Sequence, residues 1–272
     1  MARTNTIKLY DGPSVLDLCP IIVLLTGLSK VSTNTKTGDM LQTWIMRKDI
    51  PPHEAVKTGQ DVSVCGGCQL RPNNHKARMR ITAAGILTHD PNGKPCYVKV
   101  WQAPLSTWKA NKDLPVTSPE IARALVAGRV LRRGSYGDPA AVPQEVWDNL
   151  RTSPGTGYSH QWEAFPHFAP YVMASVHTEG ERERARALGY RTFRIISDVS
   201  EVSTGEVLCP ASKEAGARVQ CAQCNLCNGS KAKVLSQGDW INGDYNPNWV
   251  EGVDYTVDWT KDKRKDIAIV AH

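Results

Sequence analysis

Between Ser118 and Ile196 the chain alternates short apolar runs with helical segments, and this alternation restricts the choice of fold more than any other feature. The pattern predicts helices over 118–127, 143–151 and 178–188, and strands over 130–134, 157–162, 171–176 and 191–196. Ser118 and Thr178 are typical N-cap residues. Strands that alternate with helices form βαβ units with parallel strands. The expected fold is therefore α/β, with a parallel sheet arranged like a partial (β/α) barrel.

The chain before Ser118 is predicted to add an N-terminal β segment. Residues 20–28 form a short apolar run typical of a buried strand, and residues 40–47 alternate as a strand does. A β-hairpin is predicted from 79–87 and 96–101, with its turn at Asn92-Gly93. Residues 1–204 are thus expected to form the core. Residues 205–272 are expected to form a C-terminal cysteine-rich metal module with a tail that contains tryptophans.

Seven of the eight cysteines fall into two groups with short spacings, and all seven are predicted metal ligands. The first group is Cys65, Cys68 and Cys96, and the second is Cys209, Cys221, Cys224 and Cys227. Two thiolates separated by two residues can bind one metal ion or one corner of a cluster, and intervening glycines relax the turn. Cys19 stands outside both groups and is predicted to be a small core residue.

The spacings fit two kinds of metal centre. Iron–sulfur proteins use the same short spacings, which predicts one or two [4Fe–4S] clusters. Zn²⁺ accepts the same thiolates and is the alternative. The first group has no evident fourth cysteine, so either His75 or His89 completes it or one coordination position is open. The sequence also leaves open whether the two groups form two sites or share one.

Composition indicates a globular chain without a membrane span. Hydrophobic residues make up 41% and charged residues 22%, which suits a folded core. No apolar run approaches the roughly 20 residues that cross a bilayer, and the first residues do not read as a secretory signal, so a cytoplasmic location is expected. Between Cys65 and Gly134 basic residues outnumber acidic ones twelve to three. An anionic small molecule or a nucleic acid is therefore an expected partner.

Several polar residues follow the predicted parallel strands at the ends where loops carry function. Ser135-Tyr-Gly-Asp-Pro follows the strand at 130–134, His160 lies near the end of the next strand, and Ser175 and His177 end another. Gly137-Asp138-Pro139 is also an ordinary turn sequence. His160 and His177 could equally be hydrogen-bonded core residues.

Several motifs resemble those of uncharacterised bacteriophage and prophage proteins. They are Asn34-Thr-Lys-Thr-Gly-Asp-Met, Cys65-Gly-Gly-Cys, Cys96-Tyr-Val, Tyr136-Gly-Asp-Pro, Tyr158-Ser-His-Gln-Trp and Cys209-Pro-Ala-Ser. The resemblance extends from about residue 20 to residue 229. It implies a phage origin and location in the host cytoplasm, and it adds a host protein to the expected partners.

The order of these features also resembles the radical S-adenosylmethionine (SAM) enzymes. That family combines a partial (β/α) barrel with a three-cysteine cluster loop, a Gly-Glu-rich motif that binds the SAM amine, and often a C-terminal cluster module. The usual cysteine spacings are three and two residues, whereas here they are two and 27, and Asp138 stands where the family generally has Glu. The resemblance implies SAM binding by Tyr136, Gly137, Asp138 and Ser175, with Asp138, His160 and His177 as catalytic residues.

Two functions follow from these observations. The first is an iron–sulfur enzyme related to the radical SAM family that acts on an unknown substrate. The alternative is a non-catalytic phage protein that zinc or a cluster stabilises and that binds a host protein or a nucleic acid.

Overall fold

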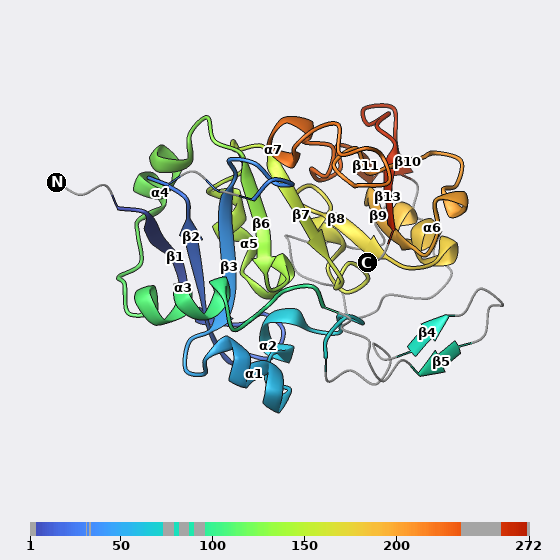
Figure 1. Ribbon diagram of the computed structural model, residues 1–272. Coiled ribbons are helices and arrows are strands. Elements are labelled where there is room, and N and C mark those ends of the chain that lie inside the picture. Colours follow the sequence, from blue (N-terminus) through green and yellow to red (C-terminus); the bar gives the residue numbers. More distant parts are fainter. Residues whose placement is uncertain are drawn as a thin grey trace.

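A computed structural model describes residues 4–30, 32, 34–72, 96–232 and 257–270 with their side chains, and the backbone of 79–81, 87–89 and 233–234. The predicted turn at Asn92-Gly93 and most of the tryptophan-containing tail lie outside these residues. The described chain is built around one large, mostly parallel sheet with helices packed on it (Figure 1).

The sheet has nine strands, and its two outer strands leave it open within the described residues. In spatial order the strands are β1 (Thr6–Pro13), β2 (Pro20–Thr26), β3 (Leu41–Arg47), β6 (Leu131–Tyr136), β7 (Gly155–Ser159), β8 (Met173–Val176), β9 (Thr192–Ile196), β13 (Asp266–Val270) and β10 (Glu206–Leu208). β2 pairs antiparallel with β1 and β3, and every later pairing is parallel. The expected α/β class is confirmed.

The helices connect or flank these strands. They are α1 (Pro52–Thr58), α2 (Val62–Cys65), α3 (Ala103–Asn111), α4 (Pro119–Val126), α5 (Gln144–Asp148), α6 (Glu179–Ala187) and α7 (Cys221–Cys224). Two small antiparallel pairs, β4 (Met79–Ile81) with β5 (Leu87–His89) and β11 (Lys233–Val234) with β12 (Val257–Asp258), lie outside the main sheet. Within the described residues no helix is long and apolar enough to cross a membrane.

Local sequence explains where the predicted helices begin. The Ser118 hydroxyl accepts a hydrogen bond from the Ile121 amide at the start of α4, and Pro119 occupies the first turn. Thr178 and Glu181 form a reciprocal capping box at the start of α6. Both helices confirm the sequence prediction to within a residue or two, as do the strands β8 and β9 that flank α6.

The apolar run at residues 20–28 forms β2, a strand with a deeply buried centre. Five consecutive side chains from Ile21 to Leu25 have no solvent exposure. A strand buried on both faces has no alternating pattern, and a continuous apolar run is what its environment requires.

The predicted hairpin of 79–87 with 96–101 is wrong. β4 pairs with β5 instead, and residues 96–99 have no regular secondary structure. Val98 and Val100 are less exposed than Tyr97 and Lys99, so this segment alternates as a strand would. An alternation of apolar and polar residues indicates which side chains are buried, but it does not indicate that the segment pairs with another strand. An extended segment that packs against the core gives the same pattern without a partner strand.

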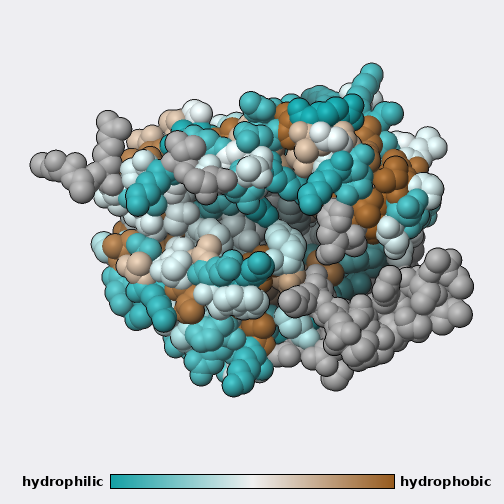
Figure 2. Space-filling model, viewed as in Figure 1, coloured by the Kyte–Doolittle hydropathy of each residue, from teal (hydrophilic) through white to brown (hydrophobic). Residues whose placement is uncertain are grey.

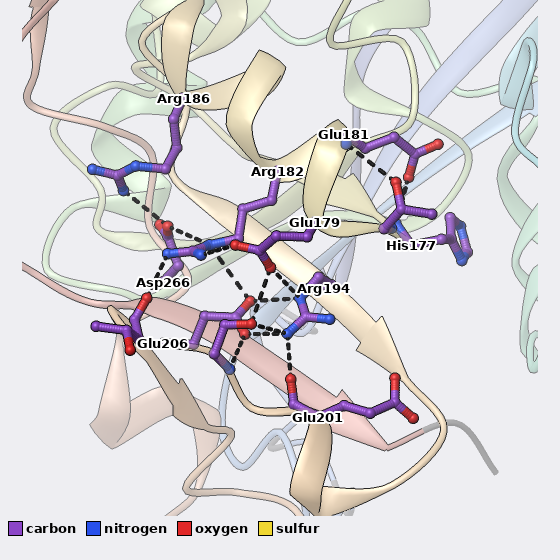
Figure 3. Close-up of polar contacts among 12 residues, drawn as sticks. His177, Glu179, Glu181, Arg182, Arg186, Arg194, Glu201, Glu206 and Asp266 are labelled. Atoms are coloured by element: carbon purple, nitrogen blue, oxygen red, sulfur yellow. Dashed lines mark hydrogen bonds and ion pairs between the residues drawn. The ribbon is translucent and has the colours of Figure 1, made fainter. Parts of the chain in front are cut away.

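A buried ion-pair network fixes the last strands of the sheet to α6 (Figure 3). Arg182 of α6 contacts Asp266 of β13 and Glu206 of β10. Arg194 of β9 pairs with Glu206, whose side chain is fully buried. Buried charges of this kind are tolerated because each is paired and hydrogen-bonded. β10 and β13, which come from the chain after residue 204, are thereby joined to the same sheet as the preceding strands.

Candidate functional site

One face of the sheet borders a cavity of about 540 Å³. Residues of β6, β7, β9 and β13 contribute to its wall. In Figure 1, α2, which ends at Cys65, and α7, which runs from Cys221 to Cys224, lie at opposite ends of the central strands β6 and β7. Figure 2 shows this face hollowed near its middle. The two cysteine-bearing segments therefore approach one cavity from opposite ends.

All seven cysteines of the two groups line this cavity. They are Cys65, Cys68, Cys96, Cys209, Cys221, Cys224 and Cys227. The two groups are far apart in the sequence, and only the fold brings them to one space. The two groups therefore line a single cavity.

The other predicted site residues divide between the cavity and its surroundings. Those that line it are Tyr136, Gly137, Asp138, His160 and Ser175. His177 is not among the lining residues, and its backbone amide donates to Glu181 in the capping region of α6. The rings of His160 and His177 are 6.0 Å apart. Burial, and then the neighbouring His177, lower the pKa of His160 to about 3, so this ring is uncharged at neutral pH.

The loop of the first cysteine group is held by two residues that follow the neighbouring strands β6 and β7. Gly66 has φ +53° and ψ −134°, a backbone conformation that favours glycine. The Gln161 side chain spans the loop: its Oε1 accepts from the Gly67 amide at 3.1 Å, and its Nε2 donates to the Cys65 carbonyl at 3.2 Å. The Asp138 amide donates to the Val64 carbonyl. Gln161 and Asp138 thus position the cysteines relative to the sheet.

The Asp138 carboxylate accepts several hydrogen bonds. One carboxylate oxygen accepts from the Ala140 amide at 3.0 Å, and the other accepts from the His160 amide at 2.7 Å. Burial raises the pKa of Asp138 to about 6, although these hydrogen bonds act in the opposite direction. The residue therefore forms a turn, as the simpler interpretation of Gly137-Asp138-Pro139 predicted, and it also lines the cavity.

The second cysteine group is attached to the sheet by a buried arginine. Arg191 has no solvent exposure, and its guanidinium donates to the carbonyls of Leu226, Asn228 and Lys265. Two of these carbonyls flank Cys227, and the third precedes β13. The Cys221 amide also donates to the Lys36 carbonyl. The group is therefore anchored from both the sheet and the loop before β3.

The thiols of the two groups have different electrostatic surroundings. Burial raises the pKa of Cys65, and neighbouring thiols and the carboxylates of Asp61 and Asp138 raise it further. Burial also raises the pKa of Cys221, but there the nearby cations Arg132 and Lys36 act in the opposite direction. The first group therefore lies beside two carboxylates, one of which is paired with Arg71, whereas the second lies beside two cations.

No three described His, Cys, Asp or Glu side chains lie close enough together to hold a single metal ion. The side chains of His75 and His89, which the sequence offered as a fourth ligand, lie outside the described residues. The structure thus brings the cysteines to one cavity without a preformed single-ion site among the residues it describes.

The sequence analysis did not select three residues of the site. Gln161, Arg132 and Arg191 gain their roles from contacts with distant segments, and neither glutamine nor arginine is typical of a metal-site motif. Two of them had a signal: Gln161 belongs to the motif Tyr158-Ser-His-Gln-Trp, and Arg132 belongs to the basic stretch between Cys65 and Gly134. Comparison with known proteins finds no matching family model, no matching curated protein and no matching solved structure.

Proposed function

We propose that the chain is an iron–sulfur protein whose two cysteine groups bind metal on opposite walls of one cavity, and that the cavity is the site of a reaction related to that of the radical SAM enzymes. The observation that carries the proposal is the convergence of seven thiols, distant in sequence, on a cavity of about 540 Å³. This volume lies in the range of small-molecule sites. In this proposal the parallel strands act as a partial barrel and residues 205–232 as the second metal module.

The donor set fits such a group. Thiolates are the usual ligands of iron–sulfur clusters. Burial raises the pKa of Cys68 and of Cys227 to about 12, so neither thiol ionises readily without a metal. Metal binding removes these protons, and it then supplies folding free energy to the segments that carry the ligands.

The order of the cysteines in the sequence supports clusters. Cys221, Cys224 and Cys227 are each separated by two residues, as cluster ligands of bacterial ferredoxins are. Zn²⁺ accepts the same thiolates and is the alternative that metal analysis distinguishes.

The two groups are proposed to have different roles. Cys65, Cys68 and Cys96 are three ligands, which leaves one coordination position facing the cavity. When bound, a cluster with such a position supplies a binding site and one electron to a sulfonium ligand such as SAM. Tyr136 and Asp138 line the cavity close to this group. The Asp138 carboxylate accepts from the Ala140 and His160 amides and also from the Ser159 and Gln161 side chains, so these residues fix its orientation at the cavity wall. The four cysteines of the second group can close their site.

Anaerobic purification followed by iron, zinc and sulfide analysis tests the proposal. The wild-type chain is expected to contain iron and matching sulfide and to absorb near ~400 nm, as thiolate-bound iron does. Cys68→Ser and Cys224→Ser should each remove part of the iron. Cys19→Ser is the matched control, because Cys19 does not line the cavity.

Zinc without iron would overturn the proposal. In that case the alternative stands: a zinc-stabilised protein that binds a host protein or a nucleic acid. Iron that survives in full in both cysteine variants would also contradict it, because the iron would then be bound elsewhere.

A further inference from the structure

Arg132 is a cation on the cavity wall, and no carboxylate of the described chain pairs with it. It lies on β6, and its guanidinium donates to the Tyr97 hydroxyl at 2.8 Å. Besides Tyr97, the Tyr158 hydroxyl and the Cys221 thiol act electrostatically on the Arg132 guanidinium. A guanidinium offers five N–H donors, and a phenol oxygen uses one of them here.

The other largely buried arginines of the described chain are satisfied differently. Carboxylates pair with Arg47, Arg71, Arg182, Arg186, Arg194 and Arg264. Backbone carbonyls accept from Arg133 and Arg191, although two guanidinium nitrogens of Arg133 and one of Arg191 are buried without a hydrogen-bond partner. Arg132 differs from all of these because its charged group faces the cavity and has only a neutral hydroxyl as its hydrogen-bond partner among the described residues.

A second cation stands near the same end of the cavity. Lys36 is exposed and also lines the cavity, and its backbone carbonyl accepts from the Cys221 amide, which places it beside the second cysteine group. No ion pair of Lys36 is present among the described residues. Two cations without carboxylate partners thus lie on the wall beside the second cysteine group.

The rest of this wall is apolar. Phe193 and Ile195 of β9 and Ile267 and Ile269 of β13 face the cavity from adjacent, parallel strands. Ligand sites typically combine such a surface with a few polar groups that fix the orientation of the ligand. A molecule with one anionic end and an apolar body would match both parts.

We propose that the cavity binds a small molecule with a carboxylate or phosphate head on Arg132, close to Lys36, and an apolar body against β9 and β13. The inference rests on the proposed function in that it names the ligand class of the same cavity. A planar guanidinium can donate two parallel hydrogen bonds to either head group.

Calorimetric titration of the full chain, purified anaerobically and with its metal content measured, tests this inference. The probes are 4-phenylbutyrate, 4-phenylbutyl phosphate and the uncharged 4-phenylbutanamide, which share an apolar body. At least one anionic probe is expected to bind about tenfold or more tightly than the amide, since hydrogen bonds between charged groups contribute this much. The tighter of the two anionic probes identifies the head group.

Variants of Arg132 test whether this residue causes the preference for an anionic probe. Arg132→Met should remove the difference between the anionic probe and the amide, and Arg132→Lys should keep part of it. Arg218→Met is the matched control, because Arg218 is an exposed arginine of the second cysteine segment that does not line the cavity. Equal binding of all three probes to the wild-type chain would overturn the inference. An undiminished preference of Arg132→Met for the anionic probe over the amide would also overturn it.

Failure of this inference is distinguishable from failure of the proposed function. A chain that contains iron but shows no preference for an anion refutes the anion site alone. A chain that contains only zinc but shows the preference, lost in Arg132→Met, refutes the iron–sulfur proposal and keeps the anion site.

Discussion

The two cysteine groups share a cavity but are built in different ways. The first lies beside the carboxylates of Asp61 and Asp138 and is positioned by Gln161, a neutral side chain. The second lies beside the cations Arg132 and Lys36 and is anchored by Arg191. Negative surroundings oppose the formation of thiolates, and positive surroundings favour it. The comparison shows that the two groups are not duplicates, and under the proposed function the first leaves one coordination position open while the second closes its site.

The largest expected effect comes from removing the anchor of the second group. Arg191→Met would leave the buried carbonyls of Leu226, Asn228 and Lys265 without their donor. Each unsatisfied buried carbonyl costs about 1–3 kcal/mol, so the variant should lose roughly 3 kcal/mol or more of unfolding free energy. Denaturant titration measures this loss, and metal analysis should show that Cys65 and its group keep their metal.

Arg218→Met serves as the control for that experiment, since its exposed side chain should make little difference to stability. Wild-type stability in Arg191→Met would show that the second group does not depend on this anchor.

A smaller effect is expected when the loop of the first group is strained. Gly66→Ala places a Cβ 2.5 Å from the Gln161 side chain at a residue with φ +53°. Backbone strain of this kind costs about 1–3 kcal/mol. The variant should lose the metal of the first group and keep that of the second, which iron analysis of the purified chain would detect.

Gly67→Ala is the matched control one residue away. A Cβ there has its nearest contact at 3.6 Å, which is ordinary packing. If both variants lost equal amounts of iron, the account of the Gly66 conformation would be wrong.

The parts of the fold that depend on residues close together in the chain could be predicted from the sequence. The capped helices that start at Ser118 and Thr178, and the strands that flank the second of them, follow from residues close together in the chain. β13 lies between β9 and β10, although it follows both in the sequence. Its five residues, Asp266–Val270, carry no local sign of that pairing. The prediction for 96–101 was wrong because burial without pairing gives the same pattern as a strand.

The candidate site could be predicted only as a set of residue types. The spacing of the cysteines identified both groups, but nothing in the spacing places them on one cavity. Arg132 is one of twelve basic residues between Cys65 and Gly134, and Arg191 belongs to none of the motifs. The roles of both depend on carbonyls, thiols and hydroxyls contributed by segments far away in the chain. Side chains that act through tertiary contacts leave no periodic signal in the sequence.

The smallest expected effect is a local loss of stability at low pH. Burial would raise the pKa of Glu206, but hydrogen bonds from Arg194 and the Ser203 amide, together with the nearby arginines, lower it overall. A carboxylate with a lowered pKa stabilises the fold above its unfolded value of about 4.3, and this contribution is lost as the pH falls through the folded pKa. Below about pH 4 the segment that leads from β10 to Cys209 should therefore loosen.

Glu206→Gln removes this titration and keeps a hydrogen-bonding side chain. Hydrogen exchange of β10 in the variant should vary less with pH between about pH 5 and pH 3 than in the wild-type chain. An unchanged pH dependence would assign the acid sensitivity to other carboxylates.

The central claim is that both cysteine groups bind iron on one cavity. Crystals of the anaerobically purified chain, measured at the iron absorption edge, test it most directly. The account predicts two iron positions on opposite walls of the cavity, one beside Cys65, Cys68 and Cys96 and the other beside Cys209, Cys221, Cys224 and Cys227. Scattering at the zinc edge alone, or iron away from these cysteines, would contradict it.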